Sequence, residues 1–206
     1  MTPLAAALGG GLAGLIGAAA AHVLATLASR AGSDSWLRGP YGPPFFTVAL
    51  YTGVFYAPIG ARAAKRAAAG AALGFLGAFL GILAPLYVLT RYGGWGMPRA
   101  SAAGTHPWRI AIVVVYSLAI WSTIAAIGAA SARTKPWRGA LSAVLGSLAG
   151  YAVLAAALRL FSGLAAAPWN PASLIPLPVN LLDGLLSGAG LCLALSLDER
   201  ISRRPL

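Results

Sequence analysis

The stretch from Ala67 to Thr90 constrains the fold more than any other part of the chain. It holds 24 consecutive residues without a charged side chain, AAAGAALGFLGAFLGILAPLYVLT. An α-helix rises about 1.5 Å per residue, so about 20 apolar residues cross the roughly 30 Å hydrocarbon core of a bilayer. The stretch is therefore predicted to be a transmembrane helix, with the basic residues Arg62, Lys65 and Arg66 just before it.

Five further apolar runs resemble this one, and the composition agrees with them. Hydrophobic residues make up 59% of the 206 residues and charged residues only 9%, whereas about a quarter of the residues of soluble proteins are charged. No segment between the runs is long enough for a second domain. We therefore predict one all-α domain over 1–206, a polytopic membrane protein whose six transmembrane helices form a bundle with short loops, at about 4–27, 45–59, 67–90, 110–130, 139–158 and 179–197.

The formal charge of +11 indicates membrane flanks and not a nucleic-acid surface. A nucleic-acid-binding protein gathers its basic residues on one soluble face, but here they are scattered between apolar runs. We therefore expect membrane lipids as partners, together with other membrane-protein subunits or self-association, and no nucleic acid. The only cysteine, Cys192, lies inside an apolar run, which leaves no disulfide framework and no cysteine-based metal site. We expect no cofactor and no metal.

Six spans place both termini on the same side of the membrane, and the basic residues can be counted by side. Nine would lie on the side of the termini: Arg62, Lys65, Arg66, Arg133, Lys135, Arg138, Arg200, Arg203 and Arg204. Six would lie on the other side: Arg30, Arg38, Arg91, Arg99, Arg109 and Arg159. Cytoplasmic loops carry an excess of Lys and Arg, so we expect both termini in the cytoplasm and a bacterial-type cytoplasmic (inner) membrane.

Glycines recur at helical spacing along four of the predicted spans. Lipid tails are as apolar as leucine, so transmembrane helices associate through close packing, and glycine lets two backbones approach. We favour packing inside the chain over self-association, contact with other membrane subunits, or a ligand path. The predicted packing residues are Gly10, Gly14, Gly17, Gly70, Gly74, Gly77, Gly81, Gly146, Gly150, Gly184 and Gly188.

Two predicted hairpins look alike, which would fit a repeat about an axis along the membrane normal. Gly70 to Gly81 of the third span matches Gly139 to Gly150 of the fifth at an offset of 69. Tyr51 and Tyr56 of the second span match Tyr116 and Trp121 of the fourth at an offset of 65. The alternative is that alanine- and glycine-rich helices match one another by chance.

Ionisable side chains within spans cost at least about 2–3 kcal/mol each on insertion scales, so they require an explanation. Asp183 and His22 lie inside predicted spans and Arg159 lies at a rim, all toward the outer surface. We predict that they form an outward-facing polar vestibule that binds a ligand. Alternatively, Asp183 pairs with Arg159, and His22 bonds a backbone carbonyl. Three uncharged residues fall at similar depths and complete the predicted site: Asn180, Tyr51 and Tyr116.

These features favour a small transport or substrate-capture membrane subunit that would need a partner to supply energy. A structural subunit that packs through its glycine faces in a larger membrane complex is the alternative. A membrane-embedded enzyme is disfavoured because acids, bases and metal ligands are scarce. Only Asp183 supplies a carboxylate inside a span, and no histidine follows Ser147 to act as its base. We predict no catalytic residue.

Overall fold

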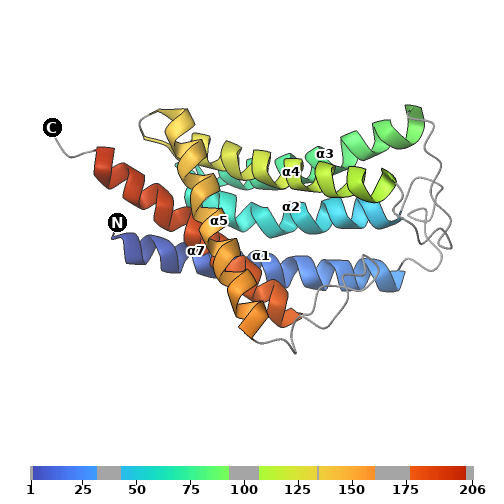
Figure 1. Cartoon of the computed structure of the whole chain (residues 1–206), viewed down its shortest axis with the longest axis horizontal. Helices are drawn as coiled ribbons and strands as arrows, with labels where there is room; N and C mark the ends of the chain where they lie inside the picture. The colour runs from blue at the N-terminus through green and yellow to red at the C-terminus, as the bar shows by residue number, and fades with distance from the viewer. Residues whose placement is uncertain (1, 32–42, 93–106, 134, 161–176, 203–206) are drawn as a thin grey trace.

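A computed structural model gives six helices and describes residues 2–31, 43–92, 107–133, 135–160 and 177–202 (Figure 1). The chain termini lie at the same end of the molecule, hereafter the terminal end. The turn between the second and third helices and the turn between the fourth and fifth also lie there. The helices are α1 Pro3–Ala31, α2 Pro43–Ala63, α3 Ala67–Tyr92, α4 Pro107–Ser131, α5 Pro136–Leu160 and α7 Leu177–Ser202.

Each predicted span coincides with one of these helices, which extend up to five residues beyond the predicted limits. Five of the six are long and apolar enough to cross a membrane, as expected for an integral membrane protein. Within the described part of the chain, the sixth helix, α2, is not among them. Its 21 residues would reach about 31 Å.

The helices form a closed ring in which each packs against the next in the order α1, α2, α3, α4, α5, α7, and α7 packs against α1. Helices α2, α4 and α7 also contact one another, so they line the centre of the ring. Large apolar side chains of α1, α3 and α5 are exposed on the outside, among them Leu12, Leu76 and Leu145. An exposed apolar exterior is what a lipid-facing surface requires.

Four antiparallel helix pairs in this ring cross at glycine in the same way. At each crossing, a Cβ built on either glycine would collide with the backbone carbonyl oxygen of the other. The crossing glycines are Gly60 with Gly70 (α2 and α3), Gly128 with Gly139 (α4 and α5), Gly146 with Gly190 (α5 and α7), and Gly188 with Gly10 (α7 and α1). The last pair joins helices from the two ends of the chain, so the first and last helices together repeat the arrangement of the two hairpins.

The crossings also correct the predicted match between hairpins. Gly70 and Gly139 are equivalent at the expected offset of 69, but Gly60 and Gly128 are 68 apart, not 65. In this match Tyr116 corresponds to Val48, and the second hairpin contains one extra residue at its turn. The aromatic pattern misled because the crossing glycines, and not the aromatic residues, set where two helices meet.

All eleven glycines predicted to mediate packing lie against another helix of the same chain. Gly17 lies against Phe55, Gly77 against Thr123 and Gly146 against Gly190. Each such contact is too close for any larger residue without a shift of its neighbour. The small-residue stripes are therefore occupied within the chain.

Of the nine basic residues expected on the side of the termini, seven lie in the described part of the chain, at or near the terminal end. Arg203 and Arg204 lie outside the described residues, as do the side chains of Arg30, Arg38, Arg91, Arg99 and Arg109.

Candidate functional site

Polar side chains lie at two levels of the central helices α2, α4 and α7, with an apolar layer between them. The layer consists of Ile59, Ile124, Ile127 and Leu191, each at most 1% exposed. Toward the end that faces away from the termini lies a group that we call the polar cluster: Tyr51, Thr52, Tyr56, Tyr116, Tyr151, Asn180 and Asp183. At the terminal end lies a larger cavity, described below.

Asn180 ties three helices together within the polar cluster. It is 1% exposed and lies in the first turn of α7. Its Nδ2 donates a hydrogen bond of 2.9 Å to the backbone oxygen of Ala18 in α1, and its Oδ1 accepts one from the Tyr51 hydroxyl of α2. Both ends of the amide are thus engaged, so Asn180 acts as a cross-link between helices.

Asp183 faces tyrosines from several helices. It lines a cavity of about 20 Å³ together with Tyr51, Tyr116 and Tyr151, which is room for about one water molecule. Its Oδ1 accepts a hydrogen bond of 2.9 Å from the Ser187 hydroxyl, one turn along α7. The ion pairs of the described residues do not include Asp183.

Two of the predicted site residues lie apart from the cluster. Gly150 of α5 lies against Leu186 of α7, and the two helices are antiparallel. Arg159 follows Gly150 on α5, so it lies about six residues, or about 9 Å, beyond the level of Asp183. It is exposed. His22 lies one turn beyond Ala18 on α1, and its backbone oxygen accepts a hydrogen bond of 2.8 Å from the Thr26 hydroxyl. The structure thus brings together Tyr51, Tyr116, Asn180 and Asp183, but neither His22 nor Arg159 lines the same cavity.

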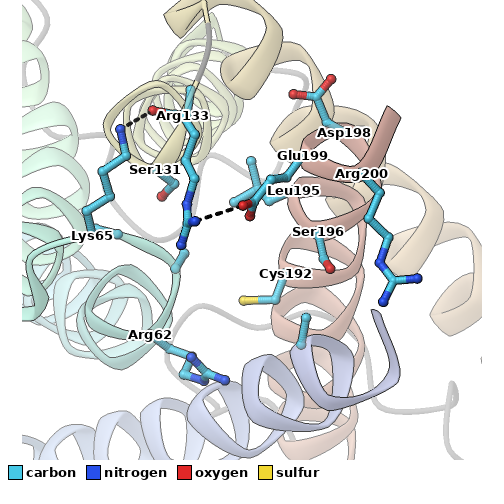
Figure 2. Close-up of a pocket in the computed structure, with 14 residues that line it drawn as sticks. Arg62, Lys65, Ser131, Arg133, Cys192, Leu195, Ser196, Asp198, Glu199 and Arg200 are labelled. Carbon is cyan, nitrogen blue, oxygen red and sulfur yellow. Dashed lines mark hydrogen bonds and ion pairs between the residues drawn. The ribbon is translucent and has the colours of Figure 1, made fainter. Parts of the chain in front are cut away.

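The terminal-end cavity has a volume of about 660 Å³ and lies among the ends of α2, α4 and α7, beside α1 (Figure 2). Ala6 and Cys192, both buried, line its deep part. Cys192 and Arg200 are eight residues apart on α7, about 12 Å along the helix. The ionised lining residues are Arg62, Lys65, Arg133, Asp198, Glu199 and Arg200.

Contacts between helix ends surround this cavity. Figure 2 shows the Arg133 guanidinium and the Glu199 carboxylate meeting between α4 and α7, where they form an ion pair of 2.9 Å. Arg138 of α5 pairs with Asp198 at the same distance. The Lys65 ammonium donates a hydrogen bond to the backbone oxygen of Ala132. These contacts link α2 to α4, and α4 and α5 to α7.

Sequence reasoning did not predict this cavity, because the basic turns were interpreted only as membrane flanks. Once the glycine crossings are known, the sequence shows that two cations are equally spaced from them. Lys65 follows Gly60 by five residues, and Arg133 follows Gly128 by five. Equivalent cations thus end two of the three central helices. Hydropathy cannot reveal such a match, because it does not fix which helices are neighbours.

No group of three or more His, Cys, Asp or Glu side chains suited to a metal ion occurs in the described part of the chain. Comparison of the chain with protein-family models, with curated proteins and with solved structures finds no match in any of the three. The candidate site therefore has to be interpreted from its own residues.

Proposed function

We propose that the protein is a small transport or substrate-capture subunit of a membrane, with a solute path along the axis of α2, α4 and α7. The observation that carries this proposal is the terminal-end cavity of about 660 Å³. Small-molecule sites are commonly about 300–1,000 Å³. A helix bundle that served only packing would not need such a space lined by ionised side chains.

In this proposal the polar cluster forms the outward part of the path, and the apolar layer around Ile124 and Leu191 closes it. The excess of basic residues at the terminal end favours a cytoplasmic location for both termini and for the larger cavity. A bacterial-type cytoplasmic membrane is the corresponding location. The chain offers no nucleotide-binding loop, so energy for transport would come from a partner subunit.

The alternative role as a structural subunit was based on the glycine stripes. Helices of the same chain fill those stripes, so they provide no free face for another subunit. No observation on the described residues favours this role over the solute path.

The natural cysteine tests the proposed path. Cys192 is the only cysteine of the chain and lines the deep part of the cavity. A membrane-impermeant thiol reagent should modify Cys192 in inverted vesicles, in which the cytoplasmic side is accessible, and not in intact cells. The readout is the mass of the purified protein after labelling.

A matched control uses the next residue. Leu193 is 36% exposed on the outer face of α7, so a cysteine placed there in a Cys192→Ser background should face lipid and stay unmodified. If Cys192 resists the reagent from both sides, no aqueous cavity reaches it and the proposed path is wrong. Equal labelling of the two cysteines would lead to the same conclusion.

A further inference from the structure

We propose that the terminal-end cavity binds a small anion of the phosphate or carboxylate class. The identification of this anion as the solute rests on the proposed function. The charges and geometry of the cavity support the binding site independently of that function.

The cavity carries an excess of positive charge. Four of its lining side chains are cationic and two are anionic. One of the two carboxylates, that of Asp198, is neutralised by Arg138, which lies outside the lining. The other, that of Glu199, is paired with Arg133. A concave site with low-dielectric walls focuses the field of such an excess and raises the local concentration of anions.

The positions of Lys65 and Arg133 suit recognition of anionic oxygens. They occupy equivalent positions just after the ends of α2 and α4, and both line the cavity. A guanidinium binds carboxylate or phosphate through a planar pair of N–H groups, whereas a lysine ammonium supplies a mobile point charge.

The Glu199 carboxylate shows which kind of chemical group the position beside Arg133 accepts. Its carboxylate oxygen lies 2.9 Å from the guanidinium, so this position already accepts an anionic group. We infer that Glu199 and the ligand compete for Arg133. Neutralising Glu199 should therefore strengthen anion binding even though it breaks an ion pair.

The anion has two possible sources with the same chemistry. One is a free solute such as phosphate or a short dicarboxylate, and the other is the phosphate of an anionic lipid headgroup. Four cations of the cavity are exposed at an end of the bundle where headgroups would lie. The experiment therefore separates the two sources by the choice of lipid.

The full-length protein is placed in nanodiscs of phosphatidylcholine, and the rate of Cys192 modification is measured against inorganic phosphate and, separately, succinate. We expect at least one of the anions to slow the modification with a saturating concentration dependence. Calorimetric titration with the same anion should give the same dissociation constant without using the thiol. If both measurements detect no binding, and 30% phosphatidylglycerol adds no protection, the anion site is refuted.

Protection by phosphatidylglycerol without any effect of the free anions would identify a headgroup and refute the solute assignment. A reactive Cys192 that no anion or phosphatidylglycerol protects, together with calorimetry that detects no binding, would refute this site but leave the proposed path intact. If Cys192 is unreactive but calorimetry detects anion binding, the proposed path is refuted and the anion site stands. The two proposals therefore fail separately.

Variants of matched charge locate the site. Lys65→Gln should weaken anion binding about tenfold, the size of one charge-assisted hydrogen bond. Arg66→Gln is the control, because Arg66 is the next residue and is exposed but does not line the cavity. It should change the dissociation constant less than twofold.

Arg133→Gln and Glu199→Gln break the same ion pair but should act in opposite directions. Arg133→Gln should weaken binding at least tenfold, and Glu199→Gln should strengthen it severalfold. Weaker binding in both variants would mean that the ion pair only holds the helix ends together, and the proposed role of Arg133 would be wrong.

Discussion

The polar cluster and the terminal-end cavity belong to the same three central helices but use their polar groups differently. In the cluster, Asn180 is 1% exposed and its amide is engaged at both ends. The neighbouring cavity holds about 20 Å³. At the terminal end, charged side chains surround about 660 Å³, and the Arg133 side chain is 59% exposed.

This difference follows from position along the membrane normal. Within a span, polar groups lack water and must satisfy one another, so they act as cross-links between helices. At a helix end, water solvates charged groups, and exposed ion pairs contribute only about 0–1 kcal/mol. Such groups can exchange a protein partner for a ligand at little cost. We therefore expect binding at the terminal end and stability from the cluster.

The largest effect is expected from Gly184→Leu, which acts on the contact between α1 and α7. Helix α7 carries residues of both the polar cluster and the terminal-end cavity. A Cβ on Gly184 would collide with the backbone of Gly14, so a leucine must force α7 away from α1. Overpacking typically costs about 1–3 kcal/mol, and a collision with backbone belongs at or above the top of this range. Thermal unfolding in detergent should show loss of the folded protein or a large drop in its midpoint.

Ala20→Leu is the control, because it adds similar bulk on an exposed face of α1. It should leave the midpoint nearly unchanged. A Gly184→Leu protein as stable as this control would mean that close contact between α1 and α7 at Gly184 is not required for the fold that positions the two regions.

A smaller loss is expected from Asn180→Ala, which tests whether the polar cluster serves stability. The substitution leaves the Tyr51 hydroxyl and the Ala18 carbonyl without their Asn180 partner. Hydrogen bonds between transmembrane helices contribute about 0.6 kcal/mol on average and up to about 1.7, and we expect a loss of about 1–2 kcal/mol. The measurement is the thermal midpoint, with Lys65→Gln at the terminal end for comparison.

Lys65→Gln should cost under about 0.5 kcal/mol, because Lys65 is exposed. If it destabilises the protein as much as Asn180→Ala does, the proposed division between a stabilising cluster and an available cavity fails.

The sequence predicted the helices better than it predicted the sites. Long uncharged runs predicted the helices, five of which are long and apolar enough to cross a membrane, and glycine spacing located the packing faces. Depth counting also brought Tyr51 together with Asn180. It did not bring His22 and Arg159 to the same cavity, because counting inward from predicted helix ends does not fix how far one helix is shifted along another: Arg159 lies about 9 Å beyond the level of Asp183. The cavity was missed because Lys65 and Arg133 are far apart in sequence and line the same cavity only once the ends of α2 and α4 are packed in the bundle.

Asp183 is the exception within the polar cluster, and the smallest change in stability is expected there. Asp183→Asn keeps the oxygen that accepts the Ser187 hydrogen bond and removes a carboxylate from the membrane interior. We therefore expect a thermal midpoint equal to that of the unmodified protein or slightly higher, within about 1 kcal/mol, because burying a neutral amide costs less than burying a charge. Anion protection of Cys192 should not change, since the apolar layer separates the two regions, whereas solute movement should be lost. A clear loss of stability, similar to that of Asn180→Ala, would make Asp183 another structural cross-link. The polar cluster would then have no residue set apart for a solute, and only the terminal-end cavity would remain as a candidate site.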